Sequence, residues 1–191
     1  MLKWLKIVCI CLIASTSNAQ DSLKVIKWEV AVNMSPDSVF AIDASHLKWE
    51  RIPEELYMYT NIVYLDLSKN KITQIPDAIT QLKKLKALNV EHNKLSGSPV
   101  YLCQLTNLVN LNLGRNEYSS IPACIGYLTN LKSLNLWSNP IGQLPEELYN
   151  CKNLKTVDMR GIVTGPKFQD SWVAKMPNVK WEFDAPCHCV E

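Results

Sequence analysis

The hydrophobic positions of the chain recur with a period of 23 residues. Aligned at Ile62, Leu85, Leu108, Leu131 and Leu154, four full units follow the pattern L-x-x-L-x-L-x-x-N. The second halves of the units share the consensus x-I/L-x-x-I/L-P-x-x-I/L-x-x-L, from which Ser98, Tyr118 and Cys151 depart. The asparagines and prolines keep the same period, at Asn70, Asn93, Asn116 and Asn139 and at Pro76, Pro99, Pro122 and Pro145. A repeat of this length indicates an architecture of stacked structural units.

Each unit predicts one short strand followed by a turn. Because side chains alternate along a strand, Leu65 and Leu67 should face inward, whereas Tyr64, Asp66 and Ser68 should face outward. A single unit cannot bury its leucines, so neighbouring units are expected to stack into a parallel sheet. The asparagine falls where the chain leaves the strand, and its amide can bond the backbone of the loop. The prolines suit the first position of a one-turn helix on the convex side.

These units resemble the leucine-rich repeat family in its 23-residue form, from about Val39 to Val163. The resemblance implies a right-handed α/β solenoid with a parallel concave sheet and a cap at each end. It also implies a function in binding proteins. The terminal units depart from the pattern, as caps do, since Leu47 and Ile162 stand where the asparagine belongs.

We expect caps over residues 20–38 and over residues 164–191, a segment that ends in a cysteine-containing tail. Hydrophobic residues alternate from Ile26 to Met34, which favours a strand, although resembling proteins often have a short helix here. Residues 168–176 read as a short helix. Residues 178–183 alternate as an edge strand does.

Residues 1–19 have the order of a secretory signal. Lys3 and Lys6 precede an apolar core at residues 7–14, and the segment 17–19 places small residues before a cleavage site after Ala19. The mature chain is therefore expected to be secreted, periplasmic or at the cell surface. No later stretch has the roughly 18 apolar residues that a membrane span needs.

Composition and charge narrow the choice of partners. The chain is 47% hydrophobic and 20% charged, which is typical of a globular protein. It has 20 basic and 18 acidic residues, and the signal contains Lys3, Lys6 and no acid, so the mature chain is neutral. A neutral exported protein gives no electrostatic reason to expect nucleic acid as a partner.

Equivalent outward positions of successive units form columns across the predicted sheet, and two of these columns differ in how much their residues vary. One is uniform, which suggests a structural hydrogen-bond ladder, and reads Asp43, Asp66, Asn89, Asn112, Asn135, Asp158. The next varies as a ligand-facing surface should, and reads Ser45, Ser68, Glu91, Gly114, Trp137, Arg160. The turn edge forms a basic ridge, equally interpretable as a solvated edge, with His46, Lys48, Lys69, Lys71, His92, Lys94 and Arg115.

The expected ligand-binding residues come from this concave face. They are Tyr64, Glu91, His92, Arg115, Trp137 and Arg160. Trp137 and Arg160 occupy equal positions in adjacent units and should touch, because neighbouring strands lie about 4.8 Å apart. An exposed tryptophan beside arginines is typical of an interface hot spot. The alternative is that Trp137 packs flat over Asn135 or Pro140.

The mature chain has five cysteines, an odd number that leaves at least one thiol unpaired within the chain. Cys187 and Cys189 are expected in a disulfide, within the tail or to the last repeat, in preference to a metal site with His188, because these ligands do not complete one. Cys151 takes an inward leucine position and reads as a small core residue. A bridge between Cys103 and Cys124 is possible but not implied.

The chain contains no constellation that predicts catalysis. It lacks a Gly-rich phosphate loop, HExxH and a nucleophile elbow, so we expect neither an enzyme nor a cofactor or metal. The sequence favours an exported monomer whose concave sheet binds a protein or peptide. The alternative is a structural or adhesive surface component without a single concave-face ligand.

Overall fold

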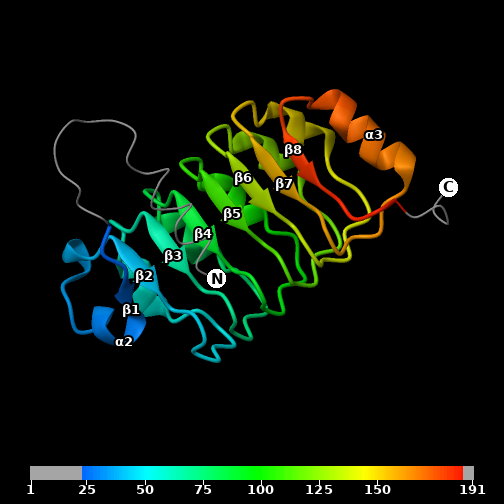
Figure 1. Ribbon diagram of the computed structural model, residues 1–191. Coiled ribbons are helices and arrows are strands. Elements are labelled where there is room, and N and C mark those ends of the chain that lie inside the picture. Colours follow the sequence, from blue (N-terminus) through cyan, green and yellow to red (C-terminus); the bar gives the residue numbers. More distant parts are fainter. Residues whose placement is uncertain (1–22, 187–191) are drawn as a thin grey trace.

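A computed structural model of the chain describes residues 23–186. The strands line one side of a curved stack of coils, and a short helix closes each end (Figure 1). They form one eight-stranded parallel sheet in sequence order, β1 to β8. The strands are β1 (Ile26–Lys27), β2 (Ala41–Asp43), β3 (Tyr64–Asp66), β4 (Ala87–Asn89), β5 (Asn110–Asn112), β6 (Ser133–Asn135), β7 (Thr156–Asp158) and β8 (Lys180–Glu182).

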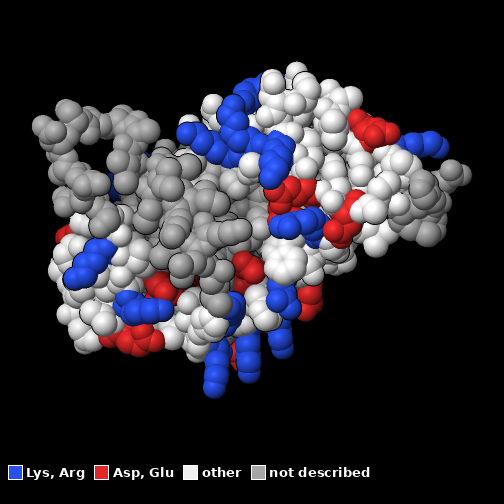
Figure 2. All heavy atoms as spheres, in the orientation of Figure 1, with Lys and Arg blue, Asp and Glu red and all other residues white. Residues whose placement is uncertain are grey.

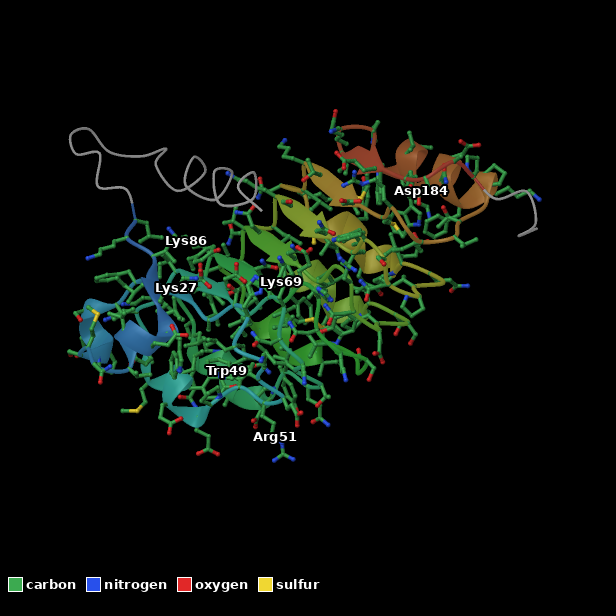
Figure 3. All side chains as sticks on the ribbon, turned by 60° about the horizontal axis from the view of Figure 1, so that its bottom comes forward. Lys27, Trp49, Arg51, Lys69, Lys86 and Asp184 are labelled. Carbon is green, nitrogen blue, oxygen red and sulfur yellow. A yellow bond between two sulfur atoms is a disulfide. The ribbon has the colours of Figure 1, made fainter. Side chains whose placement is uncertain are left out.

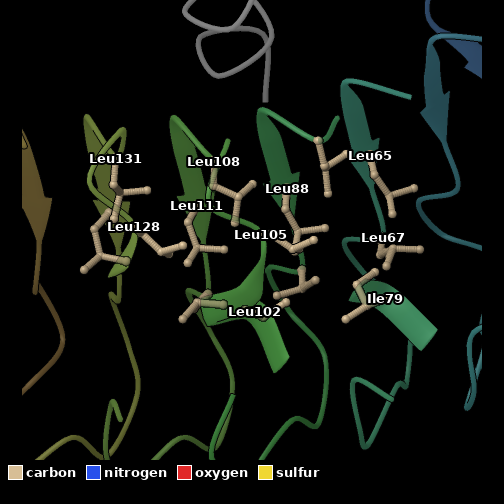
Figure 4. Close-up of a cluster of buried hydrophobic side chains, with 14 of the residues drawn as sticks. Leu65, Leu67, Ile79, Leu88, Leu102, Leu105, Leu108, Leu111, Leu128 and Leu131 are labelled. Atoms are coloured by element: carbon tan, nitrogen blue, oxygen red, sulfur yellow. The ribbon is translucent and has the colours of Figure 1, made fainter. Parts of the chain in front are cut away.

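The register of the sheet follows the sequence repeat. From β2 to β7, each residue pairs with the residue 23 positions later, as Leu65 does with Leu88 and Leu88 with Leu111. The inward leucines of successive coils therefore stack on one another in a continuous core (Figure 4). Leu65, Leu67 and Leu88 are fully buried. The prediction of a leucine-rich solenoid with a parallel sheet is confirmed.

The asparagine of each unit joins neighbouring coils through their backbones. The side-chain amide of Asn93 donates to the carbonyl oxygens of Leu67 and Val90, both at 3.0 Å, while its Oδ1 accepts from the N–H of Ile72 at 2.9 Å. Asn116 repeats the arrangement one coil later and also donates to the oxygen of Val90. Inner carbonyls are thus shared between two asparagines, which makes the ladder continuous.

The convex side carries 3-10 turns in place of regular helices. Each proline lies one residue before its turn, as the N-cap, and not at the first helical position that the sequence suggested. The shift is small, since a proline has no N–H to lose at either position. The turns are η2 (Glu54–Met58), η3 (Asp77–Gln81), η4 (Val100–Gln104), η5 (Ala123–Tyr127) and η6 (Glu146–Asn150).

The N-terminal segment differs from the expected strand. Only β1 is extended, and the chain then forms the helix α2 (Trp28–Ala31) and the 3-10 turn η1 (Pro36–Ser38). The helix buries Ala31 completely and places Trp28 edge-on to Trp49 and Tyr59, at centroid distances of 5.3 and 5.9 Å. The contacts that the helix makes with the first coil therefore stabilise it over the strand that the alternating pattern predicts.

The C-terminal segment covers the last coil. The helix α3 (Pro166–Lys175) lies where the sequence predicts one, and β8 then pairs with β7 (Figure 1). Trp172 is buried and packs 5.7 Å from Trp181, and Trp181 in turn stacks on Phe183. These aromatic side chains shield the leucines of the last repeat from water. Among residues 23–186, no helix is both long and apolar enough to cross a bilayer.

Candidate functional site

The uniform column of the sheet holds the backbone just beyond each strand. The side-chain oxygen of Asn112 accepts from the N–H of Gly114 at 3.0 Å, and Asn135 accepts in the same way from Trp137 at 3.0 Å. The same bond, over two residues, occurs at Asp43, Asp66, Asn89 and Asp158. Because this turn bond repeats in every coil, it fixes the backbone that carries the varied column.

Trp137 rests on Gly114 of the preceding coil. A methyl group placed at Gly114 would overlap Cδ1 and Nε1 of the indole, so this glycine makes room for the ring. The guanidinium of Arg115 lies 5.4 Å from the centre of the same ring, a cation–π contact. Trp137 stays half-buried while Arg115 is exposed. The indole therefore lies over Gly114.

Arg160 lies beside Trp137 but is bound to acids of its own end of the sheet. Its guanidinium donates to both carboxylate oxygens of Asp158, at 2.9 and 2.6 Å, and lies 3.3 Å from Glu182. The hydrogen bonds to Asp158, together with its charge, raise the pKa of Arg160 above its usual value. Trp137, Ser138, Arg160 and Gly161 line a shallow hollow of about 430 Å³. The indole therefore forms one wall of a hollow that holds a guanidinium.

The turn edge of the sheet repeats an unusual backbone conformation. A residue with positive φ precedes each ladder position, at His46, Lys69, His92, Arg115, Ser138 and Gly161. Residues other than glycine rarely adopt this backbone conformation, and the sheet and the asparagine ladder impose it here. Four of these positions carry basic side chains, and Lys and Arg side chains project from the lower rim of the molecule (Figure 2).

The charge of this rim affects His92. Partial burial lowers the pKa of His92, and the positive charges of Arg115, Lys69 and His46 lower it further against the opposing effect of Glu91. The side chains of His46, Lys48, Lys71, His92, Lys94 and Arg115 are exposed, and Lys69 is half-buried. Basic side chains are thus concentrated along this rim, an arrangement that favours acidic groups nearby.

Two further residues of the expected ligand-binding set, Tyr64 and Glu91, are also engaged within the protein. Tyr64 is only 1% exposed, because its ring packs with Ala41 and Ala87 of the flanking strands and is covered by Leu23 and Val25. Tyr64, named among the expected ligand-binding residues, therefore faces outward but is buried. Glu91 is half-buried and accepts a 2.9 Å hydrogen bond from Asn112.

The cysteines divide between a bridge and a buried thiol. Cys103 of η4 and Cys124 of η5 form a disulfide with a Cα–Cα distance of 5.6 Å, a pairing that the sequence left open. Cys151 is fully buried, and burial raises the pKa of its thiol to about 11. Cys187 and Cys189 lie outside the described residues. Within residues 23–186, no three His, Cys, Asp or Glu side chains are grouped to hold a metal ion.

Sequence reasoning missed two features of the surface. Gly114 is the glycine of the varied column and precedes the column's tryptophan by one unit, which is the signal that it seats Trp137. The tetrapeptide Glu-Glu-Leu-Tyr occurs twice, at residues 54–57 and 146–149, in equivalent turns of different coils.

Comparisons with known proteins agree with this architecture. The profile of the leucine-rich repeat region matches residues 52–176. No curated protein matches the chain in sequence. A leucine-rich repeat protein of Leptospira interrogans has a similar structure, with 29% identity and a TM-score of 0.67 over 76% of this chain and 36% of that one.

Two further solved structures share the fold. An internalin, InlF, of Listeria monocytogenes is 22% identical, with a TM-score of 0.66 over 78% of this chain and 44% of that one. A plant peptide hormone receptor, RGFR1, solved in complex with RGF2, is 31% identical, with a TM-score of 0.62 over 77% of this chain and 24% of that one. The chain thus spans less than half the length of each of these structures.

Proposed function

Because this chain belongs to the leucine-rich repeat family, we propose that it is an exported module that binds a protein or peptide on its concave face. Repeats of this family are generally used for protein binding and are generally not enzymes. The solenoid presents a sheet whose outward side chains are held by a rigid backbone. The proposal includes a signal over residues 1–19, caps over 20–38 and 164–191, and repeats over 39–163.

The observation that carries the proposal is the packing of Trp137 on the neighbouring coil. A half-buried indole held over Gly114 and below Arg115 is a large, pre-ordered contact surface. Tryptophan and arginine are enriched among the residues that dominate binding energies at interfaces. The hollow between Trp137 and Arg160 offers room for one side chain of the partner. His92 and the rest of the basic rim would meet an acidic segment of it.

Export is supported by two further observations. The disulfide between Cys103 and Cys124 would be stable in an oxidising compartment outside the cytosol. The solved bacterial structures with the same fold include internalins of Listeria monocytogenes. The expected signal segment lies outside the described residues, so secretion, the periplasm and the cell surface remain alternatives within the proposal.

The test is capture of partners from the exported proteome with the purified mature protein. We expect a partner retained by the native protein to be lost with Trp137→Ala, because removing such an anchor weakens binding by about 2 kcal/mol or more. Tyr127→Ala is the matched control, since Tyr127 is an exposed aromatic side chain on the convex turn η5. Arg115→Ala should act mainly on the association rate and its salt dependence.

A second variant separates binding from folding. Gly114→Ala should displace the indole of Trp137 and weaken binding, while leaving the leucine core untouched. If Trp137→Ala and Tyr127→Ala both capture the partner normally, the concave site is wrong. If neither variant nor the native protein captures a partner, and all three assemble equally on the cell surface, the structural or adhesive alternative is favoured.

A further inference from the structure

The two copies of the Glu-Glu-Leu-Tyr tetrapeptide have different surroundings. In η6, Nζ of Lys175 forms an ion pair with Glu146, at 2.6 and 2.8 Å from its two carboxylate oxygens. Nζ of Lys152 lies 3.1 Å from the ring centre of Tyr149. This copy of the tetrapeptide therefore holds two ammonium groups of the protein itself, one on its first carboxylate and one on its tyrosine ring.

The copy in η2 has the same side chains without such partners. Glu54 and Tyr57 occupy the positions of Glu146 and Tyr149, and Thr60 stands where the second copy has Lys152. No Lys or Arg of residues 23–186 forms an ion pair with Glu54. Within the described part of the chain, Glu54 thus lacks the ion pair that Glu146 forms, and Tyr57 is 5% exposed where Tyr149 is 51% exposed.

A hollow of about 400 Å³ opens beside this first copy, between coils that carry η2 and η3. The residues that line it include the acids Glu50, Glu54 and Asp77 and one base, Arg51, so acidic residues outnumber basic ones. Arg51 points away from the body of the coils at the edge near Trp49 (Figure 3). The volume is within the range of pockets that hold small ligands.

A buried hydroxyl on the wall of the hollow also lacks a partner. Tyr57 is 5% exposed, and its Oη is buried without a hydrogen bond among the described residues. Burial raises the pKa of Tyr57, and the negative charges of Asp77 and Glu54 raise it further. A buried polar group without a hydrogen bond is costly, so an N–H donor at this place would be favourable.

From these observations we propose that the hollow between η2 and η3 is a binding site for a cationic group, an ammonium or a guanidinium. Glu54 and Asp77 provide the opposite charge, and the hydroxyl of Tyr57 provides a hydrogen-bond acceptor. Such a group could belong to a lysine or arginine side chain of a protein or to a free small amine. The site lies outside the concave face and does not depend on the function proposed for it.

The test is a titration of the mature protein with small probes. Binding is followed through the shifts of the backbone amide signals in NMR spectra. Nα-acetyl-arginine amide and Nα-acetyl-lysine amide represent a protein side chain, and putrescine represents a free amine. We expect saturable shifts at Thr73, Gln74 and Ala78, which line the hollow. The neutral Nα-acetyl-citrulline amide should leave these signals unchanged. Stronger binding of the capped residues than of putrescine would identify a protein as the source, and the reverse order a free amine.

Matched variants in the two copies of the tetrapeptide test whether Tyr57 and Glu54 are responsible for binding the cation. Tyr57→Phe should weaken binding about tenfold, as the loss of a hydrogen bond to a charged group does, without lowering the melting temperature. Glu54→Gln should weaken it as well. Tyr149→Phe and Glu146→Gln make the same changes in η6 and should leave the affinity of the hollow unchanged. Equal effects in the two copies, equal binding of citrulline and arginine, or no saturable shift with any cation would overturn the proposal.

Discussion

Asn93→Ala tests how the asparagine ladder holds neighbouring coils together. The substitution removes the donors to Leu67 and Val90, but each of these carbonyls keeps a second donor, from Asn70 and Asn116 respectively. The N–H of Ile72 has no such reserve, because its hydrogen bond goes to Asn93. The change therefore leaves essentially one buried donor unpaired, which costs about 1–3 kcal/mol.

The end of the ladder should be more sensitive than its middle. Asn139 accepts from the N–H of Tyr118 and donates to Leu113 and Leu136. Ile162 stands one repeat later, where the asparagine would be, so no further ladder side chain shares the carbonyl of Leu136. Asn139→Ala should thus leave a carbonyl as well as an N–H unpaired, and it should lower stability more than Asn93→Ala does.

Urea unfolding followed by circular dichroism measures these differences. The control is Asn33→Ala, because Asn33 is exposed and its side-chain amide donates to the backbone oxygen of Glu29, at 3.1 Å, outside the ladder. Changes at such surface sites are usually within about 0.5 kcal/mol. For a chain of this length, a loss of about 2 kcal/mol corresponds to a fall in melting temperature of roughly 4–8 °C. Equal, small losses for Asn93→Ala and Asn33→Ala would refute the reasoning.

Three further predictions concern cysteines and pH. Replacing Cys103 and Cys124 by serine should lower the free energy of unfolding by about 2–4 kcal/mol, and a reductant should abolish this difference from the native protein. Cys151, buried and with its pKa raised to about 11, should resist iodoacetamide at neutral pH until urea unfolds the chain; rapid native labelling would contradict its burial. The pKa of His92 is lowered in the folded state, so the unfolded chain binds more protons just below pH ~6.5 and stability should fall as the pH drops through this window. His92→Gln should flatten the urea midpoint against pH there, and an unchanged slope would show that His92 is not responsible.

The repeats were predictable because their side chains contact mainly the neighbouring coil. A period of 23 residues identifies Leu65 and Leu88 as inward neighbours, and the structure pairs them in register. The alternation around Trp28 misled because α2 is set by contacts of Trp28 with Trp49 and Tyr59, which lie in the next coil and are not visible as local periodicity.

The sequence predicted which face of the sheet the candidate site residues occupy, but it did not predict their side-chain contacts. Tyr64 faces the expected side of the sheet, but Leu23 and Val25, far away in sequence, cover it. Trp137 and Arg160 line one hollow, as their equal positions suggest, but the pair of short hydrogen bonds from Arg160 to Asp158 of its own coil was not foreseen. The alignment of the repeats gives the position of each residue on the surface. Which of several charged or aromatic neighbours a side chain binds depends on side-chain geometry, which the alignment does not contain.

The constant register of the sheet also bears on how the length of such a protein can change. Since partners on β3 and β4 are one period apart, removing residues 71–93 would bring Lys94 directly after Asn70, in phase with every later coil. The shortened chain would keep both caps and the pair Cys103 and Cys124, and it would lose the contacts of a single layer. Duplication of the same segment would lengthen the concave surface by one strand. We therefore expect gains and losses of whole coils to be tolerated, whereas an insertion of a few residues within a strand would disturb the side-chain pattern of that coil.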